Sequence, residues 1–245
     1  MSDRIFSIGE SGIEAADERV KSLMSNMVNA ETPGFRKSDV VQTSFPLELA
    51  AAERRLASMR PEVESAYYDY APGALIRTGN STDLAIGGDG FFVISTPWGE
   101  SFTRDGRFAL NKDGQLVTVS GGHLVLGKRG PIIVPAGSEV EVTNLGEIKV
   151  DGATVDSIRI ADVPDKGMLE AVSGSVMRSK APGAIFYDKE SPNVVQGYVE
   201  SSNVSMVDEM MNLVMVSRLY GINVKVIQAR DANLSRAVEM GRPLQ

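Results

Sequence analysis

The stretch from residue 202 to residue 240 constrains the fold of this chain more than any other. Within it, apolar or aromatic residues recur at alternating steps of four and three, the heptad pattern of helices that pack along their length. The stripe consists of Met206, Met210, Leu213, Ser217, Tyr220, Val224, Ile227, Asp231, Leu234 and Val238. Ser205 is a candidate cap just ahead of it, and Asp208 and Glu209 complement the positive end of a helix that starts there. A helix over 206–238 would be roughly 50 Å long at about 1.5 Å per residue, so it needs a partner along its length.

The N-terminus offers that partner, because the same alternation runs from residue 6 to residue 30. Its positions are Phe6, Gly9, Ile13, Ala16, Val20, Leu23, Met27 and Ala30. One such segment alone favours an amphipathic helix packed on the core of a monomer, whereas two matching segments at opposite ends favour coiled-coil pairing. Small and polar residues on both stripes would make an isolated hairpin weak, so we expect more than two helices to share the packing. The predicted assembly interface is Ile13, Val20, Leu23, Met27, Met206, Met210, Leu213, Tyr220, Val224, Ile227 and Leu234.

Between the two helical ends the sequence pattern changes. Pro33 and Gly34 predict that the first helix ends near Ala30, and the composition of residues 47–60 predicts a short helix that stops at Pro61. From residue 74 to about residue 152, short β-branched or aromatic runs alternate with Gly, Asp, Asn and Pro, a spacing typical of an antiparallel meander. The expected hairpin turns and later strands are Asp105-Gly106, Asp113-Gly114, 157–163 and 183–188. The predicted fold class is therefore α+β, mainly β: an inserted antiparallel β-domain flanked by N- and C-terminal coiled-coil-forming helices.

Composition narrows the classes of function. With 245 residues and 42% hydrophobic content, the chain can bury a core, and its net charge of -7 argues against a nucleic-acid partner. Cysteine is absent, which removes disulfides, thiolate metal sites and a cysteine nucleophile. The first residues are acidic where a cleavable signal peptide is basic and then apolar, and no apolar run is long enough for a membrane span.

A search for catalytic or ligand-binding patterns points to none. His123 is the only histidine, which leaves no two-histidine metal site. Residues 122–128 match G-x-x-x-x-G-K, but Arg129 stands where a phosphate loop needs Ser or Thr, and the residues after it indicate a strand where that loop needs a helix. Residues 87–90 are glycine-rich and indicate a tight turn, because aromatic residues and no helix follow. We expect no catalytic, cofactor or metal site, and so no enzyme.

Three segments carry a resemblance to a known family. The first, SNMVNAETPGFRKS at 25–38, is similar to the Asn-x-x-Asn-Ala-x-Thr-Pro-Gly-Phe/Tyr signature of the flagellar basal-body rod proteins, a family that includes rod, hook and related axial proteins. The second, at 78–127, resembles their run of Leu-Asp-x-Ala-Ile-x-Gly-x-Gly-Phe-Phe, Tyr-Thr-Arg-Asp-Gly and Asp-Gly-Gln-Leu-Val-Thr. The third, at 196–228, is similar to their Gly-x-Leu/Val-Glu-x-Ser-Asn-Val segment and helical end. Thr82, where Leu is more usual, and Phe102, where Tyr is more usual, depart from the pattern.

The matching motif residues are Asn29, Thr32, Pro33, Gly34, Phe35, Asp89, Gly90, Phe91, Phe92, Thr103, Arg104, Asp105, Gly106, Ser202, Asn203 and Val204. The resemblance implies a structural subunit of the periplasm-spanning rod, a hollow shaft that transmits torque from motor to hook and passes exported subunits. It implies helical axial segments at 1–35 and 202–245 that pair, a connecting segment with a short helix at 36–73 and a β-rich outer domain at 74–201. The implied partners are copies of itself, other rod and hook-side axial proteins and the flagellar export apparatus. The resemblance also implies export from the cytoplasm without a cleaved signal peptide, no membrane insertion and no cofactor.

Within the family, residues 130–142 resemble the proximal rod protein more than the distal one. A distal rod or hook-like axial protein is the alternative within the family. An alternative of another class is a non-flagellar periplasmic binding module whose helices form a dimerisation stalk. Its candidate ligand site would be Phe91, Phe92, Trp98, Phe102 and Phe108, although aromatic residues at strand spacing are more typical of a core.

Overall fold

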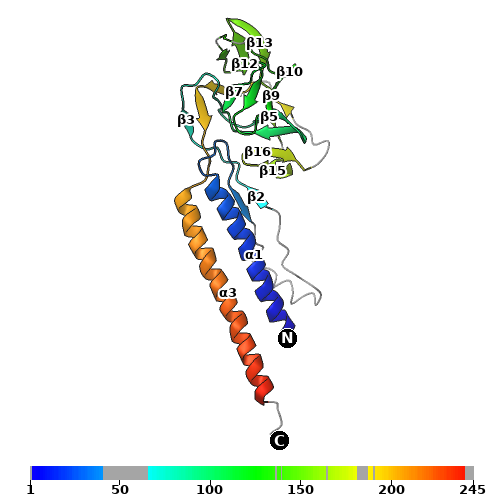
Figure 1. The fold of residues 1–245 in the computed structure, drawn as a ribbon, viewed down its shortest axis with the longest axis vertical. Helices are drawn as coiled ribbons and strands as arrows, with labels where there is room; N and C mark the ends of the chain where they lie inside the picture. The colour runs from blue at the N-terminus through cyan, green and yellow to red at the C-terminus, as the bar shows by residue number, and fades with distance from the viewer. Residues whose placement is uncertain are drawn as a thin grey trace. The chain divides into compact units, whose positions relative to one another are not determined.

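The computed structural model describes residues 2–240 except 41–65, 136, 139, 164, 181–186 and 190. The chain forms two compact units (Figure 1). The described residues of the helical unit are 2–28, 38–40, 66–67 and 205–240, and those of the β-rich unit lie within 29–37 and 68–204. The predicted helix at 47–60 and part of the predicted strand at 183–188 lie outside the described residues.

Two helices that lie side by side and run antiparallel dominate the helical unit (Figure 1). α1 spans Ser2–Val28 and α3 spans Met206–Met240. α1 ends close to Ala30, as predicted, and α3 begins directly after Ser205, whose Oγ accepts a hydrogen bond from the Asp208 N–H at 3.4 Å. This bond confirms the predicted cap, because a cap residue satisfies an amide that has no partner inside the helix. Strands β1 (Ser38–Val40) and β2 (Ala66–Tyr68) pair beside them.

The β-rich unit contains the remaining strands, and every described pairing in it is antiparallel. The strands are β3 (Leu75–Arg77), β4 (Leu84–Ile86), β5 (Phe91–Thr96), β6 (Gly99–Thr103), β7 (Phe108–Leu110), β8 (Leu116–Thr118), β9 (Leu124–Gly127), β10 (Gly130–Pro131), β11 (Val140–Val142), β12 (Glu147–Val150), β13 (Ala153–Ser157), β14 (Ile160–Asp162), β15 (Leu169–Ser173), β16 (Val176–Ser179), β17 (Tyr187–Asp188), β18 (Val194–Gln196) and β19 (Tyr198–Glu200), with a 3-10 turn at Lys166–Met168. The main sheet has the order β15-β16-β6-β5-β9-β8-β7. The prediction of an α+β, mainly β chain is confirmed.

Strand β5 is buried on both faces, which explains its continuous apolar sequence. Phe92 and Ile94 join the larger core cluster, and Phe91 and Val93 join a second cluster on the opposite face. Successive side chains of a strand point to opposite faces, so a strand with both faces covered needs apolar residues throughout. The Phe92 ring packs edge-on against Phe108 with centroids 5.1 Å apart.

One predicted turn is confirmed and the other is wrong. Asp113-Gly114 lies in the β7–β8 hairpin, where Gly114 has φ 74° and its N–H donates to the Asn111 carbonyl at 3.0 Å. Asp105-Gly106 joins β6 to β7, which are not neighbours in the sheet, so it does not close a hairpin. Gly106 is instead required by a close approach, because a Cβ there would lie 1.6 Å from the Leu84 carbonyl oxygen. The glycine therefore marks tight packing between segments and not a reversal of the chain.

The helices give no sign of a membrane span. Over the residues that the structure describes, neither helix holds a stretch that is both long and apolar enough to cross a bilayer.

Candidate functional site

Two of the four predicted interface residues of α1, Val20 and Leu23, pack in an apolar cluster that includes α3. Leu23 is buried in a small cluster with Ala16 and Val216, and Val20 packs against that cluster. Ile13 and Met27 are half-buried. Ala16, Val20 and Leu23 make up the α1 side of an apolar seam between the two helices.

On α3 the predicted stripe only partly coincides with the surface that packs on α1. Leu213 packs against the apolar cluster, and Val224 and Ile227 are half-buried. Met206, Met210 and Tyr220 remain exposed, and the side chain of Leu234 lies outside the described ones. Val216 is buried next to Ser217, which is exposed, so the seam is rotated by about one residue from the predicted stripe.

A buried asparagine provides a polar anchor in the helical unit. Asn26 has no exposed surface, and its Oδ1 accepts hydrogen bonds from the N–H of Ser38 at 2.9 Å and from the Ser38 hydroxyl at 3.2 Å. Its Nδ2 donates to the Ser38 carbonyl at 2.7 Å and to Glu209 Oε2 at 3.1 Å. One side chain therefore joins α1 to β1 and to the first turn of α3. Asn26 is the first Asn of the 25–38 signature.

The other end of that signature packs inside the β-rich unit. Gly34 has φ 68°, and its N–H donates to the Glu200 carbonyl at 2.8 Å. A Cβ on Gly34 would lie 2.2 Å from the carbonyl carbon of Arg104, so only glycine fits. Phe35 is buried next to it, and Thr32 closes the preceding turn through its N–H to the Asn29 carbonyl at 3.0 Å.

Three charged side chains meet at the centre of this packing, and we call Arg36, Arg104 and Glu200 the ion triad. Arg36 Nη2 lies 2.7 Å from Glu200 Oε1, and Arg104 Nη1 lies 3.0 Å from Glu200 Oε2. All three side chains are at most 5% exposed. The ion triad joins residues from all three family segments, because Arg36 belongs to 25–38, Arg104 to 78–127 and Glu200 to 196–228.

Backbone groups complete the setting of the ion triad. Glu200 Oε1 also accepts from the Gly73 N–H at 2.9 Å, and Arg36 Nη1 donates to the Ala71 carbonyl at 2.9 Å. Arg104 donates to the carbonyls of Ile86 and Gly88, and its guanidinium lies 5.3 Å from the centre of the Phe91 ring. Burial lowers the pKa of Arg104, and the neighbouring Glu200 carboxylate opposes that shift.

The remaining motif residues have structural partners of their own. Asp105 is buried and accepts from Arg107 Nη2 at 2.8 Å and Nε at 3.0 Å, and this hydrogen bond is the main reason that the pKa of Arg107 is raised. The Thr103 hydroxyl accepts from the Asp105 N–H at 3.0 Å. Asp89 is exposed and pairs with Lys166 at 3.0 Å, which lowers the pKa of Asp89. The next residue, Gly90, has φ 113°.

The C-terminal motif residues bind the chain that precedes the sheet. The Asn203 Oδ1 accepts from the Lys37 N–H at 2.7 Å, and its Nδ2 donates to the carbonyls of Asp69 and Ala71 at 2.9 and 3.1 Å. The Ser202 hydroxyl accepts from the Val204 N–H at 3.2 Å. The residues directly after α1 and directly before α3 in the sequence are therefore hydrogen-bonded to each other within the β-rich unit.

Residue-level sequence reasoning missed Asn26, Arg36, Glu200 and Glu209 as key residues. All four lie inside the family segments at 25–38 and 196–228, but a charged or amide side chain in a motif does not identify its partner. The useful signal was the neighbouring residue, because Arg36 directly follows Phe35 and Glu200 directly follows Val199, and an unpaired charge is costly beside buried apolar residues.

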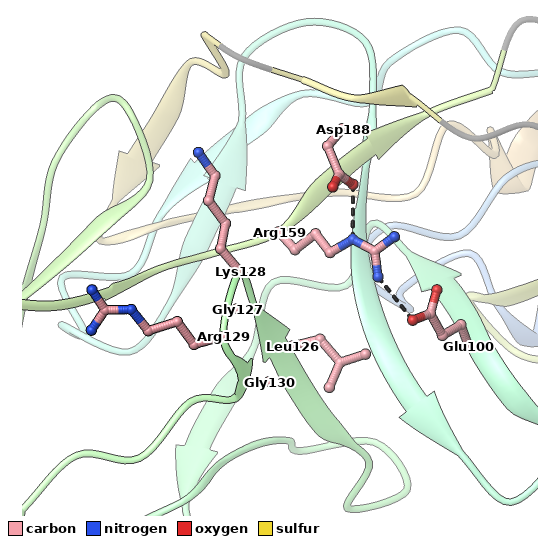
Figure 2. Close-up of a pocket in the computed structure, with 8 residues that line it drawn as sticks. All are labelled: Glu100, Leu126, Gly127, Lys128, Arg129, Gly130, Arg159 and Asp188. Carbon is pink, nitrogen blue, oxygen red and sulfur yellow. Dashed lines mark hydrogen bonds and ion pairs between the residues drawn. The ribbon is translucent and has the colours of Figure 1, made fainter.

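A surface pocket of the β-rich unit is a candidate ligand site. The pocket, of about 580 Å³, is lined by Glu100, Leu126, Gly127, Lys128, Arg129, Gly130, Arg159 and Asp188 (Figure 2). At its centre Arg159 is held by Asp188 and Glu100, each at 2.8 Å, and the hydrogen bond to Asp188 is the main cause of the raised pKa of Arg159. The pocket therefore presents a neutralised arginine and no pair of groups arranged for acid and base catalysis.

Two sequence hypotheses about ligand sites can be compared with this geometry. Residues 124–127 form strand β9 and Gly130–Pro131 form β10, so the rejection of a phosphate loop at 122–128 is confirmed. Four of the five aromatic residues of the hypothetical binding module, all but Trp98, are at most 3% exposed and lie in the core. Within the described residues, no group of three His, Asp or Glu side chains is placed to hold a metal ion.

Comparison with known proteins agrees with the segments that meet in this structure. The family model described as "Flagellar hook protein FlgE/F/G D1 domain" matches residues 85–152, and the one described as "Flagellar basal body rod FlgEFG protein C-terminal" matches residues 195–240. The flagellar basal-body rod protein FlgF of Rhizobium meliloti (strain 1021) is 32% identical over 92% of both chains. FlgF of Salmonella typhimurium is 31% identical over 88% of this chain and 89% of its own length, and the rod protein FlgG of Bacillus subtilis is 26% identical over 96% and 97%. These relatives are structural rod proteins and not enzymes, and this chain belongs to the flagellar basal-body rod protein family as a structural subunit of the rod in the basal body.

Proposed function

We propose that this rod subunit polymerises through its terminal helices into a hollow shaft that transmits torque from motor to hook and passes exported subunits. The observation that carries the proposal is that α1 and α3 pack together and still leave large apolar side chains exposed. Met206, Met210 and Tyr220, which belong to the predicted interface, are 38%, 52% and 44% exposed. Because each Å² of apolar surface removed from water contributes about 25 cal/mol, covering them in an assembly is favourable.

The polymer would grow by heterologous contacts. A patch on one subunit that docks on a different patch of the next gives an open helical array when the rotation does not close a ring. We assign this role to the axial segments 1–35 and 202–245, with 36–73 as the connection and 74–201 as the outer domain. Within the first axial segment, α1 ends at Val28 and Asn29–Lys37 packs in the β-rich unit, so α1 is the part available for polymerisation.

The isolated subunit cannot cover its apolar helix faces, so we expect the terminal helices to exchange amide hydrogens faster than the β-rich unit before assembly. Hydrogen exchange on dilute monomer tests this expectation. Equal protection of both helices and of strand β5 in the monomer would contradict it.

Substitution of interface residues tests the polymerisation itself. Leu213→Asp and Ile227→Asp place a charge on the helical seam and should abolish rod assembly and motility while the β-rich unit stays folded. Met210→Asp tests the same function at a side chain that is already exposed, so the subunit's own fold is not strained. Val119→Asp is the matched control, because Val119 is 58% exposed in the β-rich unit. Motility retained in all three helix variants would refute the proposal.

The finer assignments rest on the resemblance of sequence. The subunit would assemble with copies of itself and with other rod and hook-side axial proteins, after export from the cytoplasm by the flagellar export apparatus without a cleaved signal peptide. The resemblance of residues 130–142 favours the proximal rod position over a distal rod or hook-like one. Deletion of the gene should stop flagellar assembly at the rod, and basal bodies from the deletion strain would show whether rod segments are missing near the motor or near the hook.

A further inference from the structure

Helix α3 is apolar on the side turned away from α1 as well as on the side that packs against it. Leu213 and Val216 belong to the seam with α1. On the other side, Val207, Met211 and Val214 are 66%, 54% and 52% exposed. With about 3.6 residues per turn these three side chains form one stripe, and Arg218 continues it. We call these four residues the outer face of α3. A helix that is apolar all round is typical of a helix covered on every side.

Helix α1 has a matching exposed stripe. Met24 and Val28 are 54% and 81% exposed, and the side chains of Asp17 and Lys21 are 58% and 62% exposed. We call these four residues the outer face of α1. Lys21 lies 2.9 Å from Asp17 within the helix, so this face carries a charged half and an apolar half.

The two outer faces have the same spacing in opposite directions. On α1, Val28, Met24 and Asp17 are separated by steps of four and seven residues. On α3, Val207, Met211 and Arg218 are separated by the same steps. Two antiparallel helices in this register pair Val28 with Val207, Met24 with Met211, Lys21 with Val214 and Asp17 with Arg218. Two apolar side chains of one face then meet two of the other, Val214 lies against the aliphatic stem of Lys21, and Asp17 meets Arg218.

We propose that the outer face of α3 docks on the outer face of α1 of a second copy of this chain. This inference rests on the proposed polymerisation and names the surfaces that carry it. Both faces belong to one chain and differ from each other, so the contact is heterologous and can repeat from copy to copy. In an array whose subunits all point the same way, α1 of one copy runs antiparallel to α3 of the next, which is the direction that the matched spacing requires.

The absence of cysteine makes this contact accessible to disulfide mapping. Two variants, Met24→Cys and Met211→Cys, each carrying a different peptide tag, are expressed in the same cells, and basal bodies are purified and oxidised. A disulfide needs Cα atoms within about 7 Å of each other. We expect a disulfide-linked dimer that carries both tags, at least fivefold more abundant than in cells that combine Met24→Cys with Ile222→Cys. Ile222 is 55% exposed but lies eleven residues further along α3 than Met211.

The remaining outcomes separate this inference from the proposed function. If both variants are present in basal bodies and no dimer carries both tags, the docking is wrong while polymerisation stands. If the Ile222→Cys combination gives more dimer than the Met211→Cys one, the register is wrong and the inference with it. If a variant is excluded from basal bodies that contain the unmodified chain, the pair Lys21→Cys and Val214→Cys, which shares the register, replaces it and is judged by the same criteria. If the unmodified chain itself is absent from basal bodies, the proposed function and the docking both fail.

Discussion

Replacing Glu200 by glutamine tests whether the ion triad stabilises the β-rich unit. The substitution preserves the shape of the side chain and removes the carboxylate that bonds to two buried guanidinium groups, at 2.7 Å from Arg36 and 3.0 Å from Arg104. The Nε atoms of both arginines are buried without a hydrogen-bond partner. The backbone carbonyls around them carry only partial charge, so after the substitution two buried cations lie close together without the carboxylate that bonds to both.

The expected cost follows from burial. Breaking a buried ion pair by removing one partner costs about 3–5 kcal/mol, because the remaining charge has lost both water and its partner. The glutamine Oε1 still accepts one hydrogen bond, worth about 1 kcal/mol, so we expect a loss of about 3 kcal/mol in the free energy of unfolding. For a unit of this size that corresponds to a melting temperature lower by roughly 6–12 °C.

Glu100→Gln is the matched control, because it makes the same chemical change in an exposed ion pair. Glu100 lies 2.8 Å from Arg159, but its side chain is 53% exposed, and an exposed pair is worth about 0–1 kcal/mol. Both variants and the unmodified protein are unfolded with urea at pH 7, and near-ultraviolet circular dichroism follows the buried aromatic residues. The reasoning is refuted if Glu200→Gln loses no more stability than Glu100→Gln.

Three further predictions come from individual contacts. Gly34→Ala should lower the free energy of unfolding by about 3 kcal/mol or more, because residue 34 has a left-handed φ and a Cβ there would clash with backbone. Gly79→Ala should lower it by about 1–2 kcal/mol, because residue 79 has a φ of 75° but open space around it. Urea unfolding of both variants checks this, and equal losses would contradict it. Asn26→Ala removes the acceptor of the Ser38 N–H and leaves the Ser38 carbonyl with the Ser22 hydroxyl as its donor. It should lower the stability of the helical unit by about 1–3 kcal/mol, read as faster amide exchange in α1, and unchanged exchange would contradict the anchor. Lys166→Met should raise the pKa of Asp89 toward 3.8, measured by NMR titration of its carboxyl group. Because the ion pair with Lys166 lowers the pKa of Asp89, the small stabilising effect of the pair is present above pH 3.8 and is lost as the pH falls through the folded pKa. An Asp89 pKa that the substitution leaves unchanged would count against the pair.

Periodicity in the sequence was enough to predict the two terminal helices and the β-rich insertion. The cap at Ser205 and the end of α1 follow from local chemistry, since a cap and a proline act within a few residues. The order of strands in the sheet does not follow from local chemistry. β5 pairs with both β6 and β9, and β9 comes later in the chain than β7 and β8, so the pairing skips two strands. Asp105-Gly106 has the composition of a hairpin turn, yet it connects β6 to β7, which are not neighbours in the sheet. Only the pairing of strands far apart in the sequence reveals this connection.

The same limit applies to the helix interface. On α3, apolar residues lie all round the first turns, so the heptad count alone does not select the side that packs on α1, and the predicted stripe chose Ser217 over Val216. The polar residues that settle the choice are Asn26 and Glu209, whose contact at 3.1 Å joins positions far apart in the sequence. A pattern with a period of a few residues carries no information about such a pair.

The family segments have a physical reason to match as long strings. Each contributes one member of the ion triad, and each charged member is stable only while the other two segments are in place. A glycine at position 34 follows from the same packing, since its amide binds the Glu200 carbonyl while its α-carbon lies against the backbone of Arg104. A substitution at any of these positions therefore removes a contact between segments that are far apart in the sequence. The Lys37–Asn203 hydrogen bond, for example, joins residues 166 positions apart. No single segment can change alone without leaving a buried charge or a clash. We therefore expect the double substitution Arg36→Met and Glu200→Leu to destabilise the unit less than Glu200→Leu alone. If unfolding measurements find that the losses of the two single substitutions add up in the double variant, the segments act independently.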